Sequence, residues 1–186
     1  MLLLYWFLNF NMKNIIFITL LFFQLSLAQQ YELDSDKSFI TYSGSHPLHD
    51  WQGTSNDVKG IFIFQEETPS RIAVSTSVAS FNSKNSSRDA HSLEILNAIN
   101  FPKVTFYSDQ ISMSEKFVSF KGKLSLHGVS IDFGTEGEII FDKDVVVLKG
   151  NFEVNPSDFG IKLPSFMLVK MKDELSLKYN LNFKMN

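Results

Sequence analysis

A strict alternation of apolar and polar side chains runs through most of the chain after Phe39 and restricts the folds open to it. The segment 118–126 is typical, and the same pattern recurs in 72–78, 146–154 and 175–183. In an extended strand successive side chains point to opposite faces, so each of these strands has one apolar and one solvated face. Antiparallel sheets produce this alternation, whereas parallel sheets covered on both faces give continuous apolar runs.

The alternation predicts about eight strands in an all-β, antiparallel fold. We expect them at 31–34 together with 38–44, then at 57–64, 71–79, 103–108, 117–127, 129–141, 145–154 and 173–184. A sheet of this size with one apolar face must pack on a second sheet or close on itself. Glycines inside strands favour closure, because a barrel bends where a side chain would obstruct it. These are Gly122, Gly134, Gly137 and Gly150.

An eight-stranded barrel has an interior that side chains can fill or that can hold one small ligand. The chain has 19 Phe residues, and fourteen of them follow residue 28. So much Phe in one small domain indicates either a bulky core or an interior shaped for an apolar guest. The alternation does not distinguish these two outcomes.

Residues 1–28 predict a secretory signal peptide. An apolar run over 15–27 follows Lys13, the only charge in this segment, and ends in a Ser-Leu-Ala sequence at Ala28. Met12 is a second candidate start. We expect cleavage near Ala28 and a periplasmic or secreted mature domain. A retained single-pass anchor is the alternative, because a start at the first methionine lengthens the apolar run.

Composition excludes several classes of protein. The chain has no cysteine, so it has neither disulfides nor an acylated lipoprotein anchor. Without Lys13 it carries 16 basic and 20 acidic residues, and the lysines are scattered. No nucleic-acid partner is therefore expected.

Two segments interrupt the alternation. The first is predicted to be a helix over 88–97, because Ser86 and Ser87 are suitable N-caps and Pro102 ends the element. We expect this helix to sit as a lid at one end of the barrel. The second is 155–169, whose two prolines and glycine predict a loop. It contains Asp-Phe-Gly, but without the other kinase motifs this reads as a turn anchored by Phe159.

The histidines do not predict a metal centre. His46 and His49 are separated by a proline in a strand end or loop, so helical geometry does not bring them to one ion. A metal site normally has three or four ligands. A structural or surface role is favoured for this pair, with metal binding as a minor alternative.

The predicted helix does not carry the signature of an active site. His91 lies three residues after Arg88, yet the chain has no cysteine and no G-x-S-x-G elbow to supply a nucleophile. Glycine-rich phosphate loops are also absent from the sequence. We therefore expect no enzymatic activity and no catalytic residue.

Several short motifs, in this order and spacing, resemble the YceI-like family of exported, lipocalin-like proteins. The resemblance covers nearly the whole chain from Tyr31 to Phe183. Its residues are Arg88-Asp89-x-His91, Phe101-Pro102-x-x-Thr105-Phe106, Gly122-x-Leu124-x-Leu126-His127-Gly128-Val129, Ser157-Asp158-Phe159-Gly160-Ile161, and a closing strand that begins near Asp173.

The resemblance implies a lipocalin-like, eight-stranded barrel over 29–186, with one short helical segment near one end. It also implies an elongated apolar tunnel, which in some family members holds a polyisoprenoid such as a quinone tail. Two segments depart from the family pattern. Residues 93–96 read Leu-Glu-Ile-Leu where the family usually has paired aromatics, and 45–53 is a variant sequence. These departures affect the identity of the ligand more than the fold.

The first hypothesis for function is an exported soluble binding or carrier protein that holds an isoprenoid or other amphipathic lipid. It requires no cofactor, and the guest suggested by the resemblance is a quinone-like polyisoprenoid. Transient contact with a membrane surface and a homodimer are both compatible with the sequence. The predicted ligand-binding residues are Phe62, Phe64, Phe106, Phe120, Leu124, Phe152 and Leu177 in the interior, with Arg88 and His91 at a polar mouth.

Two rival hypotheses remain open from the sequence. One is a barrel filled by its own side chains, which acts as a stress-related or protein-interaction module without a bound lipid. The other is an enzyme that acts on a lipid headgroup, with Arg88 and His91 at the mouth.

Overall fold

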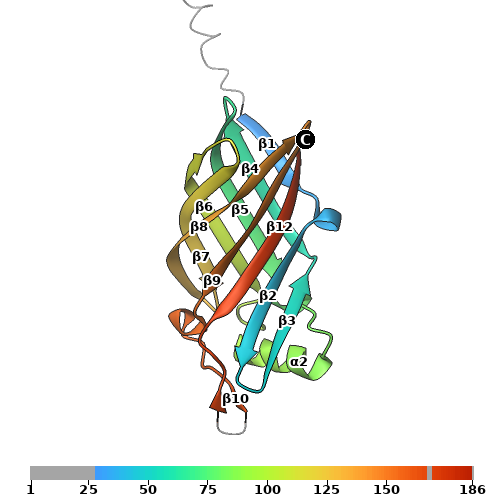
Figure 1. The fold of residues 1–186 in the computed structure, drawn as a ribbon, viewed down its shortest axis with the longest axis vertical. Coiled ribbons are helices and arrows are strands. Elements are labelled where there is room, and N and C mark those ends of the chain that lie inside the picture. The colour runs from blue at the N-terminus through green and yellow to red at the C-terminus, as the bar shows by residue number, and fades with distance from the viewer. Residues whose placement is uncertain (1–27, 167–168, 186) are drawn as a thin grey trace, which may run out of the picture.

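The alternating segments form one antiparallel sheet that closes on itself as an eight-stranded barrel (Figure 1). The computed structural model describes residues 28–166 and 169–185. Neighbouring strands follow the order β1-β4-β5-β6-β7-β8-β9-β12, and β12 pairs back to β1. The barrel strands are β1 (Ala28–Leu33), β4 (Val58–Gln65), β5 (Thr68–Ser77), β6 (Lys103–Met113), β7 (Phe117–Leu126), β8 (Val129–Asp142), β9 (Val145–Val154) and β12 (Leu175–Met185).

This closed antiparallel barrel confirms the predicted fold class. The predicted signal peptide and the alternative anchor lie in residues 1–27, outside the described residues, so both stay predictions. Within the described part of the chain, no helix has the length and apolar content needed to cross a bilayer.

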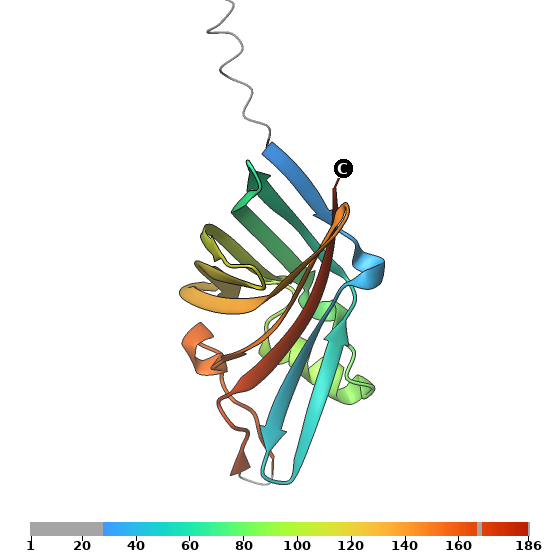
Figure 2. The ribbon, with the colours of Figure 1, turned by 45° about the horizontal axis from the view of Figure 1, so that its top comes forward.

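One edge of β12 has two different partners. Near the upper end in Figure 1 it pairs with β1, from Leu33 opposite Phe183 to Tyr31 opposite Met185. Lower down, residues 175–180 pair with β2 (Phe39–His46), which forms a hairpin with β3 (His49–Ser55). The hairpin therefore replaces β1 and β4 in the lower wall (Figure 2).

Strand β3 was not predicted from the sequence. The sequence predicts a strand end or loop here, with Pro47 between His46 and His49. Residues 49–55 form a strand instead because their backbone pairs with β2, from His46 opposite His49 to Ile40 opposite Ser55. Backbone pairing with a neighbour makes a strand here without an apolar face of its own.

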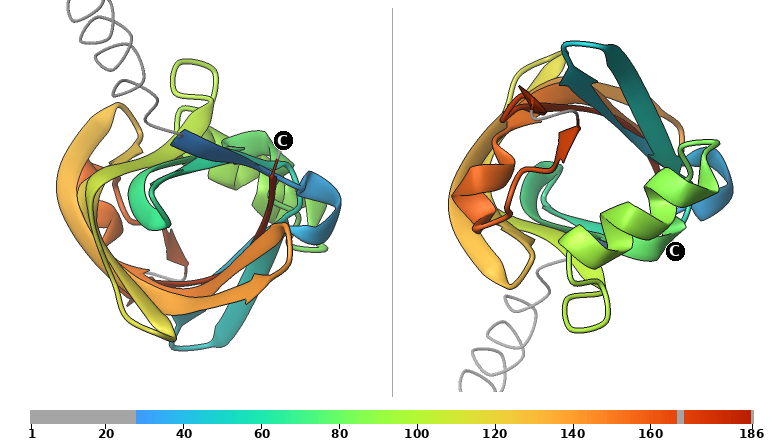
Figure 3. Two further views of the ribbon diagram at one scale, coloured as in Figure 1. Left: turned by 90° about the horizontal axis from the view of Figure 1, so that it is seen from above. Right: turned by 90° about the horizontal axis from the view of Figure 1, so that it is seen from below.

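The helix α2 (Ser86–Ile95) lies near one end of the barrel, as the resemblance implies, but along one side of that end and not across it as a lid (Figure 3). It begins two residues earlier than predicted, and its N-cap is Asn85, whose side chain accepts the Arg88 N–H at 3.0 Å. The predicted caps Ser86 and Ser87 are its first two residues. Asparagine and serine are about equally good caps, so the residue type alone does not fix the start.

Several other boundaries differ from the prediction. The predicted strand over 31–34 and 38–44 is two strands, β1 and β2, and β5 begins three residues before the predicted start. Strand β6 runs to Met113, five residues past the predicted end, because a bulge between Ser108 and Gln110 shifts its alternation. The predicted loop over 155–169 contains a short pairing of β10 (Ser165–Phe166) with β11 (Val169–Lys170). The remaining elements are short 3-10 turns at η1 (Ser35–Lys37), η2 (Val78–Ser80) and η3 (Pro156–Phe159).

The upper half of the barrel is filled by aromatic side chains. Phe62 and Phe183 are completely buried, and their ring centroids lie 5.6 Å apart. Phe64 adds a third ring, 4.6 Å from that of Phe62. Aliphatic side chains such as Val118 and Val146 close the spaces around these rings. This cluster, which we call the upper core, is the main apolar core of the fold.

A tyrosine lies across the inner wall on two glycines. Gly137 on β8 pairs with Gly150 on β9, and Gly150 pairs with Tyr179 on β12. A Cβ atom on Gly137 or Gly150 would lie 2.3 or 2.4 Å from the Tyr179 hydroxyl oxygen. The two glycines therefore form a notch that lets the ring lie against the wall. The sequence predicts that Gly137 and Gly150 permit curvature of the strands. Their close contact with the Tyr179 side chain is a second reason for glycine at these two positions.

We predict that Phe183→Ala lowers the free energy of unfolding by about 3–5 kcal/mol, because it removes a fully buried ring next to the β1–β12 seam. The control is Phe117→Ala at the exposed start of β7, with an expected loss below about 1 kcal/mol. Urea unfolding of the two variants measures the difference. Equal losses would contradict the assignment of the core to the upper half.

We predict that Gly150→Ala costs about 1–3 kcal/mol of stability, because the new methyl group would overlap the Tyr179 ring. In a Tyr179→Leu background most of this cost should disappear, with a coupling of about 1 kcal/mol or more in a double-mutant cycle. Thermal or urea unfolding of the four proteins gives the coupling. The same cost in both backgrounds would mean that Gly150 is required for another reason.

Candidate functional site

The lower half of the barrel encloses a cavity of about 480 Å³. This volume lies within the range of cavities that hold small molecules in proteins, roughly 300–1,000 Å³. Apolar side chains that point inward from the strands form most of its wall. Typical members are Phe106, Leu124, Phe133, Phe152 and Leu177.

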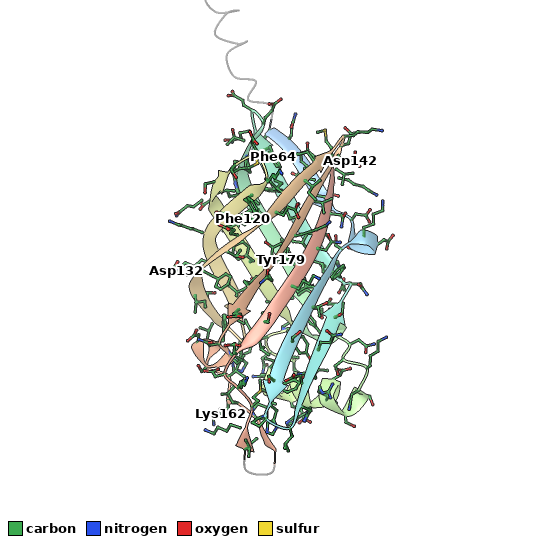
Figure 4. The ribbon with its side chains drawn as sticks, viewed as in Figure 1. Phe64, Phe120, Asp132, Asp142, Lys162 and Tyr179 are labelled. Carbon is green, nitrogen blue, oxygen red and sulfur yellow. The ribbon has the colours of Figure 1, made fainter. Side chains whose placement is uncertain are left out.

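Five residues form the boundary between this cavity and the rest of the upper core. Each belongs to the upper core and also lines the cavity, so together they form a floor between the filled and the hollow half. Figure 4 places Phe120 and Tyr179 near the middle of the barrel, below Phe64. The floor residues are Ile72, Phe120, Leu148, Tyr179 and Leu181.

The other end of the cavity lies among α2, the β2–β3 hairpin and residues 161–165 together with Met171. The helix contributes apolar side chains at Leu93, Ile95 and Leu96. At these positions the sequence departs from the family pattern, which usually has paired aromatics. They are half-buried, and Ile95 and Leu96 pack against a second apolar cluster around Phe159.

A row of rings and one guanidinium borders the mouth. The ring centroids of His46 and His49 are 5.7 Å apart, as are those of His49 and Trp51. The Arg88 guanidinium carbon then lies 5.9 Å from the Trp51 ring centroid, within the range of a cation–π contact. This row, which we call the mouth ladder, joins the β2–β3 hairpin to α2.

His46 links the hairpin to the β10–β11 segment. The backbone N–H of Leu48 donates to Nδ1 of His46 at 3.2 Å, so Nε2 carries the proton and donates to the Val169 carbonyl at 3.0 Å. Both ring nitrogens are thus used in hydrogen bonds. The described residues contain no group of three or more His, Cys, Asp or Glu arranged to hold a metal ion.

Tyr42 lies beneath the helix at the mouth. Burial raises the pKa of its hydroxyl above the ordinary value, and the Asp89 carboxylate raises it further. Arg88 and hydrogen bonds with the side chains of Ser92 and Trp51 lower the pKa in part. The hydroxyl therefore stays protonated near neutral pH and serves as a polar contact between hairpin and helix.

The remaining polar motif residues of the helix are used structurally or are exposed. The backbone N–H of Ser83 donates to both carboxylate oxygens of Asp89, at 3.1 and 3.3 Å, which holds the loop before α2. His91 is largely exposed, and its Nδ1 lies 3.7 Å from the Glu94 carboxylate.

Two further motifs hold the lower end together. His127 donates from Nδ1 to the Phe159 carbonyl at 3.1 Å, and its ring lies 5.6 Å from that of Phe101. Phe159 is fully buried, which confirms the prediction that it anchors its turn. Gly160 follows with a φ of 69°, in the left-handed region that favours glycine.

Seven of the nine predicted ligand-binding residues line the cavity, and two do not. Those that line it are Phe106, Phe120, Leu124, Phe152, Leu177, Arg88 and His91. Phe62 and Phe64 point inward as expected, but they pack in the upper core above the floor. The implied elongated tunnel is thus a cavity confined to the lower half, because aromatic rings fill the rest.

Sequence reasoning did not assign the hairpin and tyrosine residues to the site. Tyr42, His46, His49, Trp51 and Tyr179 all line the cavity. Trp51 was the available signal, since one of only two Trp residues in the chain stands beside an unexplained His-rich segment.

Comparisons with known proteins agree with this architecture. The YceI-like domain model matches residues 31–183. Protein YceI of Salmonella newport is 28% identical over 144 residues, which cover 74% of this chain and 73% of that protein. Protein YceI of Salmonella agona is 30% identical over 142 residues, with coverage of 72% and 74%.

Solved structures show the same fold at low sequence identity. BcnA of Burkholderia cenocepacia matches with a TM-score of 0.73 at 17% identity, over 81% of this chain and 98% of that one. A polyisoprenoid-binding domain from Saccharophagus degradans matches with a TM-score of 0.68 at 13% identity, over 84% and 98%. Because the domain model spans nearly all of the barrel, this chain belongs to the YceI-like family.

Proposed function

We propose that this protein is an exported, soluble binding or carrier protein that holds an isoprenoid or other amphipathic lipid in the lower cavity. The apolar chain of the guest lies along the inward side chains, and its polar end lies at the mouth ladder. The single observation that carries the proposal is the apolar cavity of about 480 Å³ beneath an otherwise filled barrel.

The energetics favour a hydrocarbon guest. At about 0.8 kcal/mol per buried CH₂, each five-carbon isoprene unit contributes on the order of 3–4 kcal/mol relative to water. A few units therefore offset the cost of association. A lipid in a membrane is already in hydrocarbon, so transfer from there changes the free energy little. The protein then acts as an exchangeable carrier, and only transient contact with the membrane surface is needed.

Relatives support the class of guest. The neighbour from Saccharophagus degradans is described as a polyisoprenoid-binding domain, and its fold matches that of this chain. We extend that class of ligand to this chain because its cavity wall is apolar and contains several aromatic rings. A quinone-like polyisoprenoid is the proposed guest. Export of the protein after cleavage near Ala28 would place it where such lipids exchange between membranes.

The rival hypothesis of a side-chain-filled barrel describes the upper half and not the lower. Phe62, Phe64 and Phe183 fill the upper interior as that hypothesis requires. Below the floor the inward side chains leave open space instead. A protein-interaction module would have no physical need for that space, because an empty apolar cavity lowers stability.

We predict that Leu177→Trp reduces the affinity for a fluorescent prenyl probe by about tenfold or more, because the indole occupies space that the guest requires. The matched control is Lys178→Trp, one residue along β12 on the solvated outer face. Its affinity should stay within about twofold of the original protein. Equal affinities for both variants would contradict a guest in the lower cavity.

Lipid extraction tests the same proposal without a chosen probe. Protein purified from its native host should release an isoprenoid or another amphipathic lipid that mass spectrometry identifies. The Leu177→Trp protein from the same host should release much less of it. Recovery of no lipid from the original protein would count against the proposed function.

A further inference from the structure

We propose that the floor of the cavity limits the length of the guest, so that this protein holds the terminal units of a prenyl chain only as far as Phe120 and Tyr179. The inference rests on the proposed function and concerns its selectivity. A barrel hollow along its whole length would accept longer chains. Here the upper half offers no continuation, because Phe62 and Phe183 behind the floor are completely buried.

Phe120 occupies the dividing position. On one side its ring centroid lies 6.2 Å from that of Phe62 in the upper core. On the other side it lies 6.3 Å from that of Phe106 in the cavity wall. The ring is only 3% exposed, although it borders the cavity. A chain that enters from the mouth therefore meets the ring of Phe120 before it reaches Phe62.

The floor is fixed from behind and from the side. Behind Phe120, the rings of Phe62 and Phe64 are 4.6 Å apart, so the phenyl group has no space into which to retreat. Beside it, Tyr179 lies in the notch formed by Gly137 and Gly150, with its hydroxyl 3.5 Å from the Glu136 carbonyl. Densely packed aromatic cores do not deform continuously to admit an extra unit. The packing of these side chains thus fixes the position of the floor.

A fixed floor has a measurable consequence for a series of guests. When the polar end stays at the mouth, each added isoprene unit buries more apolar surface until the chain reaches the floor. Further units must bend or protrude into water, and the affinity stops increasing. The chain length at which the affinity levels off therefore reports the depth of the floor.

The experiment measures the affinity of prenyl alcohols of increasing length, from geraniol through farnesol and geranylgeraniol to longer chains. Phe120→Ala removes about six carbon atoms from the floor, on the order of one isoprene unit. Leu124→Phe acts in the opposite direction, because Leu124 lines the cavity on the same strand, nearer the mouth. The matched control is Phe117→Ala, the same chemical change at an exposed position of the same strand, outside the cavity wall.

We expect the affinity of the original protein to rise about tenfold or more per unit and then to level off. Phe120→Ala should level off one unit later, and Leu124→Phe one unit earlier. Phe117→Ala should level off where the original protein does. If Phe120→Ala does not fold, the earlier levelling in Leu124→Phe tests the inference alone.

Three results would overturn the inference. An affinity that keeps rising through the longest chain would show that the floor does not stop the guest. The same levelling length in the original protein and Leu124→Phe would show that cavity depth does not set it. Both leave lipid binding itself intact. Failure of the original protein to bind any prenyl alcohol would instead overturn the proposed function, and the inference with it.

Discussion

The double pairing of β12 determines where this barrel is filled and where it is hollow. Its upper part pairs with β1 and completes a ring of eight strands, whose interior side chains can fill without a gap. Its lower part pairs with β2 instead, and the β2–β3 hairpin takes the place of β1 and β4 in the wall. Among the described residues, the backbone pairing of β3 on its other side is a single bridge from Thr54 to Asn82. The helix α2 lies beside this incomplete part of the wall (Figure 3).

This division separates two roles that a uniform barrel would have to combine. The upper core supplies densely packed aromatic surface, and burial of such rings is a major source of stability in a small domain without disulfides. An apolar cavity costs stability in proportion to its size. Because the cavity is confined to the lower half, the side chains around the pairing of β1 with β12 remain densely packed. The notch of Gly137 and Gly150 beneath Tyr179 marks the boundary between the two halves.

The sequence predicted the barrel well because its strands share one simple signal. Alternation depends only on which face of a strand meets the interior, and β7 or β12 has the same pattern from end to end. For the same reason alternation could not reveal where the interior is empty. Phe62 and Phe106 are both inward on their strands, yet one is completely buried in the upper core and the other borders the cavity. Their difference depends on which side chains meet across the interior, such as Phe183 against Phe62, and these residues are far apart in the chain.

The mouth was hard to predict because it depends on side chains of different elements. Strand β3 exists through its pairing with β2, and the mouth ladder exists because α2 brings Arg88 to Trp51. The helix α2 contacts the hairpin through the cation–π contact and hydrogen bonds around Tyr42, and the loop before the helix forms the bridge at Asn82. Segments held by a few partly exposed contacts open at a lower free energy than a packed core. Exchange of a guest is therefore expected at the helix end, while the upper core stays closed.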